Sequence, residues 1–316
     1  MTRPLTIGTR GSLLALWQSR HIAQCLRDTG VPQVELQIIK TTGDRITDRH
    51  PSQISEKGIF VKEIEEALLD KSVDLAVHST KDLPGELPAG LTLGAHPERV
   101  DPRDALITRQ GLSLDDLPQG AVLGTVSLRR RAQFLARRPD LKFTDMRGNV
   151  DTRLRKMEDG EVDGIVLAYA GLRRLELADH RCWPVPVEIC LPAPGQGVMG
   201  IECREDDPEV LAALAKLEDA AARQEVTAER KVLSQLDAGC LVPLAALGRV
   251  KDGHLTVDGL VARPDGSEII KERCEGDAGD AEQIGLQVAE ALRARGAVEL
   301  LAEARAGASD QTAADE

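Results

Sequence analysis

Aromatic side chains are scarce in this sequence, which has three Phe, two Trp and one Tyr among its 316 residues. Proteins that bind single-stranded nucleic acid stack the bases on such side chains and attract the phosphate backbone with positive charge. Here 52 Asp and Glu outnumber 40 Lys and Arg, so the formal net charge is −12. These features argue against a general nucleic-acid-binding protein, and any site for anions has to be local.

Long apolar runs are also missing. No stretch approaches the roughly 20 apolar residues that a membrane span requires, and the first ten residues contain no apolar segment typical of a signal peptide. The six cysteines are scattered without a Cys-x-x-Cys pair, which argues against a zinc cluster and against a disulfide framework. We expect a cytoplasmic protein without membrane contact, in which any functional cysteine acts singly.

The first hundred residues alternate between short β-like runs and longer helical patterns, as in a mostly parallel α/β sheet. A helix should begin after Ser12, which can cap it, and stop at Gly30. Residues 41–58 lack periodicity and predict a long mobile loop. The other elements expected here are strands at 5–8, 34–39 and 73–77 and a helix from residue 59.

A second unit begins near residue 101 and repeats this pattern. Each unit has a strand, a Gly-Thr turn and a Ser at a helix start, with Ser127 as the counterpart of Ser12. Two helix N-termini that open from strand ends are potential anion sites, so we expect a ligand cleft between two lobes. The elements expected in this unit are strands at 121–125, 141–144 and 165–169 and helices at 127–137 and 150–157.

The remainder of the chain predicts a return to the first lobe and then a third unit. Residues 198–203 are strand-like and follow Pro194-Gly195-Gln196-Gly197. A helix from residue 220 and strands near 245–250, 254–262 and 268–273 should be closed by one helix at 281–305. Residues 306–316 are small and polar, and we expect them to be disordered.

Ten basic residues lie between positions 127 and 156, against three acidic ones. Arg129 and Arg130 fall in the first turn of a predicted helix, where a cation costs roughly 0.3–1 kcal/mol unless an anion is bound. The planar guanidinium matches a carboxylate or phosphate in two bonds at once. The cluster therefore indicates either an anion site or a solvated basic face.

Three further residues each allow a functional and a structural interpretation. Asp82 follows Lys81 at a strand end, where α/β sheets place ligands. Its carboxylate can offset positive charge on a substrate or pass a proton to a leaving amine. The structural alternative is that Asp82 is a surface turn residue. A Schiff-base role for Lys81 lacks the apolar surroundings that would depress its pKa. Cys240 lies in a Gly-containing loop that could present its thiol, or it is a small buried hydrophobe. His78 has no second ligand at metal spacing and should be a structural hydrogen-bonding residue.

Taken together in chain order, seven motifs closely resemble the porphobilinogen deaminase, or hydroxymethylbilane synthase, family over nearly the whole chain. The motifs are Gly8-Thr9-Arg10-Gly11-Ser12-Leu13, Lys57-Gly58-Ile59-Phe60, His78-Ser79-Thr80-Lys81-Asp82-Leu83-Pro84, Gly124-Thr125-Val126-Ser127-Leu128-Arg129-Arg130, Arg147-Gly148-Asn149-Val150, Pro194-Gly195-Gln196-Gly197 and Gly239-Cys240.

This resemblance implies a transferase of tetrapyrrole (haem) biosynthesis that joins four porphobilinogen molecules head to tail, releases ammonia at each step and yields linear hydroxymethylbilane. It implies one covalent dipyrromethane cofactor held by a thioether, and a monomer. It also implies two α/β lobes of the type II periplasmic-binding-protein kind around a cleft, with a smaller α+β C-terminal domain. The implied division is residues 1–100 with 198–216, residues 101–197, the cofactor-attachment domain 217–305 and a disordered tail 306–316.

The resemblance also implies roles for individual residues. Asp82 falls on the family's catalytic carboxylate, which assists deamination and stabilises the cationic pyrrole nitrogens, and Cys240 falls on the attachment position. The other cofactor-binding positions are Lys81, Thr125, Ser127, Arg129, Arg130 and Arg153. The substrate-binding positions are Arg10, Ser12, Lys57, Phe60, Arg147, Asn149, Arg174 and Gln196. Many cations suit a chain of pyrroles, because every ring carries two carboxylates.

The chain departs from the family pattern at three positions that are often basic, which here hold Thr6, Gln53 and His180. Two other functions are open to the same sequence. A two-lobed binding protein of the periplasmic type would share the fold but would normally carry an export signal and would need no thiol in a third domain. A nucleic-acid-binding protein would use the Arg cluster, against the net acidity and the few aromatics.

Overall fold

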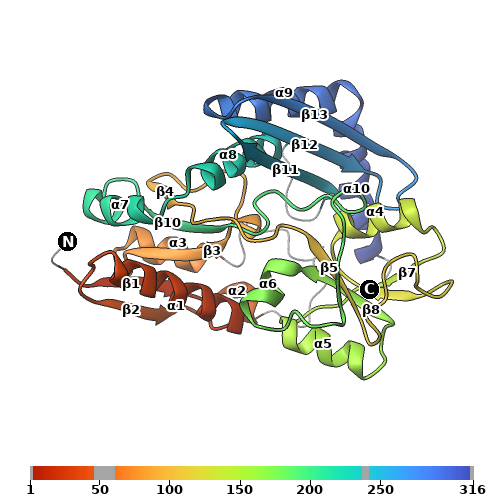
Figure 1. The fold of residues 1–316 in the computed structure, drawn as a ribbon, viewed down its shortest axis with the longest axis horizontal. Coiled ribbons are helices and arrows are strands. Elements are labelled where there is room, and N and C mark those ends of the chain that lie inside the picture. The colour runs from red at the N-terminus through yellow and green to blue at the C-terminus, as the bar shows by residue number, and fades with distance from the viewer. Residues whose placement is uncertain (1–2, 46–60, 237–241, 314–316) are drawn as a thin grey trace.

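The computed structural model describes residues 3–45, 61–236 and 242–313, which form three sheets with their helices. Figure 1 shows two five-stranded sheets side by side and a three-stranded sheet packed above them. In the described residues no helix has both the length and the apolar character needed to cross a membrane.

The first lobe is the sheet β2-β1-β3-β10-β4 with its helices. Strands β1, β2 and β3 are parallel, and β10 runs antiparallel between β3 and β4. Strand β10 comes from beyond the second lobe, so the predicted return of the chain is confirmed. The elements of this lobe are β1 (Leu5–Thr9), α1 (Leu13–Asp28), β2 (Val34–Ile38), α2 (Thr42–Arg45), α3 (Lys62–Leu69), β3 (Leu75–Ser79), η2 (Thr80–Asp82), β4 (Leu91–Ala95), β10 (Met199–Arg204), α7 (Pro208–Leu214) and η3 (Ala215–Leu217).

The second lobe is the sheet β7-β6-β8-β5-β9, in which β6 is parallel to β7 and β8, while β5 is antiparallel to β8 and β9. Its strand order follows the same pattern as in the first lobe: in both sheets the fourth strand is antiparallel to its two neighbours. All five residues of β5 are buried, so its sequence shows no alternation and the strand was not predicted. The elements are β5 (Asp104–Thr108), β6 (Val122–Gly124), α4 (Leu128–Arg137), β7 (Lys142–Thr144), α5 (Val150–Glu158), β8 (Gly164–Ala168), α6 (Tyr169–Arg174) and β9 (Cys182–Pro184).

The third unit is an antiparallel sheet β11-β12-β13 covered by helices on one face. Gly259 permits close helix packing there, because a Cβ on it would come within 2.4 Å of Val288 on the covering helix. The three units together confirm the predicted class, two α/β lobes and a smaller α+β unit. The elements of the third unit are α8 (Ala220–Gln235), β11 (Leu244–Lys251), β12 (His254–Ala262), β13 (Ile269–Asp277), η4 (Ala278–Asp280), α9 (Ala281–Ala294) and α10 (Ala297–Ala313).

Three expectations about local structure are corrected. The single helix expected at 281–305 is two helices, since Gly296 takes a left-handed conformation (φ +91°) between α9 and α10. The disorder expected from residue 306 is wrong for residues 306–313, which continue α10 because alanine favours helix. In the expected loop 41–58, residues 42–45 form α2, and residues 46–58 lie outside the described part of the chain.

Candidate active site

The loop after β3 presents Asp82 on a short 3₁₀ turn. Asp82 is exposed, whereas its neighbour Leu83 is fully buried and its amide donates to the Thr80 carbonyl at 3.1 Å. The Thr80 amide in turn donates to the Val198 carbonyl at 3.1 Å, next to the Pro194–Gly197 segment. Gly195 is required there, because a Cβ on it would lie 2.7 Å from the Thr80 methyl group and its φ is +74°. The carboxylate is therefore carried into solvent on a backbone held from both sides.

Lys81 points inward from the same turn. Its Nζ donates to Gln196 Oε1 at 3.4 Å. Burial lowers the pKa of Lys81 to about 8; Arg130 and Arg129 add to this effect, whereas Asp82 and Asp104 oppose it. The sequence shows no apolar surroundings that would depress the pKa of Lys81, and the expectation of an ordinary pKa is corrected. The pKa is lowered because the folded chain removes water from the ammonium group and places cations near it.

The Arg129–Arg130 pair at the start of α4 is buried and is paired with Asp104. Arg129 Nη1 lies 2.6 Å from Asp104 Oδ2, and Arg130 Nε and Nη2 lie 3.0 and 2.8 Å from Oδ1. Burial would raise the pKa of Asp104, but the two guanidinium charges outweigh it and hold that pKa well below its usual range. The anion expected at this helix start is thus supplied by the chain itself, and no motif had drawn attention to Asp104.

Arg153 and Arg174 are cations whose hydrogen bonds in the described structure go to backbone carbonyls. Arg153 Nε donates to Gly148 at 2.8 Å, and Arg174 Nη2 donates to Gly197 at 2.9 Å. Burial lowers the pKa of each to about 10; for Arg153, Arg130 adds to this and Asp82 opposes it. Arg153 therefore shares one electrostatic neighbourhood with Arg130 and Asp82.

The predicted cap at Ser12 is confirmed, and its counterpart Ser127 caps α4 in the same way. Ser12 Oγ accepts from the Ala15 amide at 3.3 Å, and Ser127 Oγ accepts from the Arg130 amide at 3.5 Å. Thr125 is buried, and its Oγ1 accepts from the Ser127 amide at 3.2 Å. Neither helix has an acidic residue in its first turn, so both N-termini keep their attraction for an anion.

The remaining site positions form two groups: some belong to the described structure, and the others lie outside the described residues. Arg10 and Arg147 are half-buried, and Asn149 is an exposed residue at the start of α5. Burial lowers the pKa of Arg147, and Asp145 opposes this. The residues outside the described part of the chain are Cys240, Lys57, Phe60 and Gln53.

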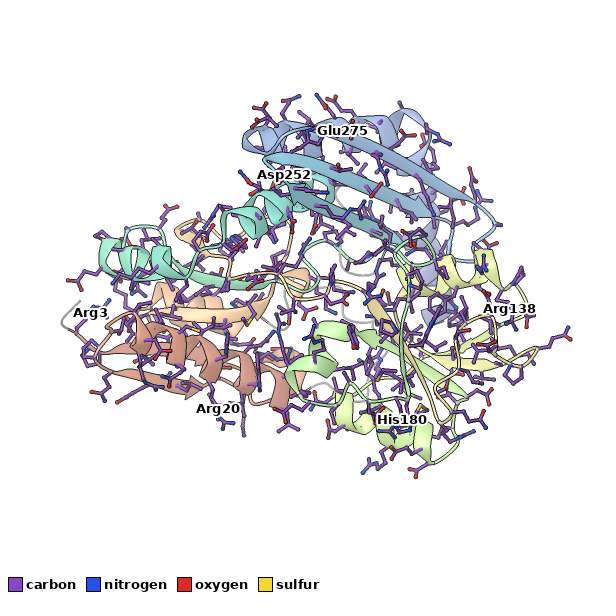
Figure 2. The ribbon with its side chains drawn as sticks, viewed as in Figure 1. Arg3, Arg20, Arg138, His180, Asp252 and Glu275 are labelled. Carbon is purple, nitrogen blue, oxygen red and sulfur yellow. The ribbon has the colours of Figure 1, made fainter. Side chains whose placement is uncertain are left out.

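Two histidines also carry expectations from the sequence. His78 is buried and its Nε2 lies 3.0 Å from Glu202 Oε2, so the structural role expected for it is confirmed. Figure 2 shows His180 at the periphery of the second lobe, where its side chain is exposed. Among the described residues no group of His, Cys, Asp and Glu is arranged to hold a metal ion.

The basic cluster is not an open positive surface. Arg138 is paired with Asp140 at 2.7 Å at the outer edge of the second lobe (Figure 2), and Arg137 is paired with Asp115 at 2.8 Å. Of the two alternatives that composition left open, a solvated basic face therefore fits poorly. The cations linked electrostatically to Asp82 are Lys81 and Arg153, which are half-buried.

Two protein-family models match parts of this chain. Residues 5–212 match the family model described as porphobilinogen deaminase, dipyromethane cofactor binding domain, and residues 223–294 match the one described as porphobilinogen deaminase, C-terminal domain. The porphobilinogen deaminase of Syntrophotalea carbinolica is 53% identical over 300 residues, which cover 94% of this chain and 95% of that one. That of Desulforudis audaxviator is 49% identical over 310 residues, covering 98% and 100%.

Solved structures similar to this chain include an ancestral cationic amino acid solute-binding protein, with 16% identity and a TM-score of 0.42 over 68% of this chain and 87% of that one. The methionine-binding protein MetQ is 13% identical, with a TM-score of 0.42 over 70% and 90%.

Proposed function

The chain belongs to the porphobilinogen deaminase family, and from that premise we propose that it is the transferase that condenses four porphobilinogen molecules head to tail into linear hydroxymethylbilane. The observation that carries this proposal is the exposed Asp82 carboxylate on the turn beside Lys81, whose ammonium is bonded to Gln196 next to the buried Arg129–Asp104–Arg130 group. One carboxylate among withdrawn cations suits a substrate that carries carboxylates and develops positive charge as it reacts.

The residues around Asp82 fit the family's dipyrromethane cofactor. Each pyrrole ring carries two carboxylates, and Arg153 and Arg174 are withdrawn cations bonded to carbonyl oxygens. We propose that Lys81, Thr125, Ser127, Arg129, Arg130 and Arg153 hold the cofactor and that Cys240 attaches it through a thioether. When bound, the cofactor supplies the pyrrole carbon onto which the first porphobilinogen is joined.

Asp82 acts on porphobilinogen itself. The bond between the aminomethyl carbon and nitrogen breaks, and its electron pair leaves with ammonia while positive charge spreads over the pyrrole nitrogen. The Asp82 carboxylate accepts a hydrogen bond from that N–H and stabilises the cation, and the backbone hydrogen bonds at Thr80 and Leu83 fix where the turn presents the carboxylate. The methylene carbon that ammonia leaves is then attacked by a free ring carbon of the partner pyrrole, which forms the new carbon–carbon bond, and that ring carbon afterwards releases its proton to water.

Substrate carboxylates are held by a second group of residues in this proposal. Arg174 is buried, and the helix start capped by Ser12 is open to an anion. The full set comprises Arg10, Ser12, Lys57, Phe60, Arg147, Asn149, Arg174 and Gln196. Because Arg binds a carboxylate in two parallel bonds, these contacts orient each ring as well as attract it.

We also propose the domain division 1–100 with 198–216, 101–197 and 217–305. The sheet composition supports it, because β10 pairs with β3 and β4 while β5 to β9 form a separate sheet. A cytoplasmic monomer that binds neither membrane nor nucleic acid is the associated proposal. The part of this proposal that concerns nucleic acid is supported by the pairing of the outer arginines with acidic neighbours.

An intact-mass spectrum of the purified protein, with Cys240→Ala as control, tests the proposal. The expected result is an added mass equal to two linked porphobilinogen units that the control lacks. If the purified protein has no adduct, it is incubated with porphobilinogen or preformed bilane before the measurement is repeated. A chain that still gains no mass on Cys240 and forms no bilane would refute the function.

A further inference from the structure

Asp104, at the start of β5, is fully buried and is the acceptor for five side-chain donors. Arg129 Nη1 donates to Oδ2 at 2.6 Å, while Arg130 Nε and Nη2 donate to Oδ1 at 3.0 and 2.8 Å. Gln196 Nε2 donates to Oδ1 at 3.0 Å, and the Cys190 thiol donates to Oδ2 at 3.4 Å. A carboxylate so enclosed cannot reach substrate, so any role it has in the reaction acts through its partners.

Each arginine is fixed at a second point as well. Arg129 Nη1 also donates to the Leu191 carbonyl at 2.8 Å, and Arg130 Nη1 donates to the Val166 carbonyl at 2.9 Å. A guanidinium is planar, so two anchored directions define its orientation. The remaining N–H groups of these two side chains are therefore presented in set directions.

Gln196 extends the arrangement from the second lobe to the first. Its Nε2 donates both to Asp104 and, at 2.7 Å, to the Pro102 carbonyl, while its Oε1 accepts from Lys81 Nζ at 3.4 Å. Gln196 is almost fully buried, and the two bonds of its amide nitrogen settle which way the amide faces. The oxygen is thereby left facing the Lys81 ammonium.

We propose that Asp104 is a positioning residue that holds Arg129 and Arg130 and, through Gln196, Lys81 in one array beside Asp82. This inference rests on the proposed function, in which Lys81, Arg129 and Arg130 hold the carboxylates of the cofactor ring that porphobilinogen must meet, so that their misplacement weakens substrate binding as well. The array contains three cations and one anion, so it keeps a net charge of +2. Asp104 thus orients the cations without cancelling their attraction for carboxylates.

The test compares Asp104→Asn with Asp140→Asn. The control removes the same charge from an Asp–Arg pair in the same lobe, between Asp140 and Arg138. Asp104→Asn should raise KM for porphobilinogen about tenfold or more, the effect of one misdirected charged hydrogen bond, with a much smaller change in kcat. The control should leave both constants unchanged.

A second readout is the pH at which Lys81 becomes reactive, measured by pulsed acylation and peptide mass mapping in the purified chain. The charges that face Lys81 are those of Asp82, Asp104, Arg129 and Arg130. Removing the Asp104 charge should move the labelling midpoint to lower pH, because an anion that stabilises the ammonium is lost. The control should not move it.

If Asp104→Asn does not fold, Gln196→Leu serves in its place, because it keeps both Arg–Asp104 pairs and removes the link to Lys81. It should also lower the labelling midpoint and raise KM. An unchanged midpoint and KM in the folded variant would overturn the proposal. A wild-type chain that forms no bilane would refute the proposed function instead, while the Lys81 midpoint would still report on the array.

Discussion

Glu229 in α8 offers the sharpest test of how the three units are held together. Its fully buried carboxylate accepts from Arg99 Nη1 and Nη2, both at 2.8 Å, where the chain passes from the first lobe to the second. It also accepts from the Gly195 amide at 2.5 Å, on the second crossing, and from the Gly248 amide at 2.7 Å, in β11. One side chain therefore bonds to both crossings and to the third sheet.

Replacing Glu229 with Ala should be strongly destabilising. Removing one partner of a buried ion pair costs about 3–5 kcal/mol, since the other charge is left in the interior. Glu225 Oε2 lies 3.1 Å from Arg99 Nη1 and retains part of the compensation, whereas the Gly195 and Gly248 amides lose their acceptor. We therefore expect the free energy of unfolding to fall by about 3–5 kcal/mol. Arg99 keeps part of its charge pairing, which reduces the loss, whereas the two amides left without an acceptor increase it.

Thermal unfolding measures this effect. For a chain of this size each kcal/mol corresponds to a shift of about 2 °C, so Glu229→Ala should unfold about 6–10 °C below wild type. The tryptophans Trp17 and Trp183 lie in the first and second lobes and report on each by fluorescence. Glu290→Ala makes the same change at an exposed site on α9 and should shift the midpoint little. A shift below 2 °C for Glu229→Ala would refute the reasoning.

Three further predictions concern individual ionisable groups. Asp82→Asn should lower kcat at least about a hundredfold with an unchanged melting temperature, because the side chain is exposed; near-normal bilane formation would remove Asp82 from its role. The pKa of Lys81 is lowered to about 8, so the ammonium is lost as pH rises through that value and KM for porphobilinogen should increase above about pH 8 in steady-state assays; a flat profile in wild type would contradict this. Burial and the nearby Glu202 raise the pKa of Glu65 to about 7. Between the ordinary pKa of a glutamate and pH 7, the folded state therefore binds more protons than the unfolded state, and the free energy of unfolding falls as pH rises through this range. Glu65→Gln should therefore stabilise the protein by about 1–3 kcal/mol at pH 8 and little at pH 4.5 in urea titrations, and equal effects at both pH values would show that the charge is not the cause.

Features encoded by neighbouring residues could be predicted from the sequence. Ser12 could be predicted as a cap because a hydroxyl before an apolar helical pattern satisfies an amide three residues on, and the repeated pattern placed Ser127 at the second helix start. The turn that carries Asp82 was placed correctly because it directly follows a buried strand. These signals are local, so they survive without knowledge of the tertiary fold.

Features that depend on distant partners could not be predicted. Asp104 is 25 residues from Arg129 and 92 from Gln196 along the chain, and Glu229 is 130 from Arg99. Asp104 follows Arg103 and Glu229 precedes Arg230, so each acid resembles a member of a charged surface pair and no periodicity marks it as buried. The excess of cations at the start of α4 allowed either an anion site or a solvated basic face, and only the folded structure, in which Asp104 bonds to both arginines, identifies a buried anion there.

The distribution of charge explains how a chain of net charge −12 can hold anionic substrates. Acidic groups at the outer surface, such as Asp115, pair with exposed arginines. Inside, Asp104 is shared by two buried arginines and the buried Arg174 donates to a carbonyl oxygen, so positive charge remains where solvent screens it least. A cluster withdrawn from solvent can therefore attract carboxylates at short range although the surface as a whole is negative. Recognition of carboxylates is therefore determined by the buried cations that no buried acid neutralises. The overall charge of the chain does not determine it.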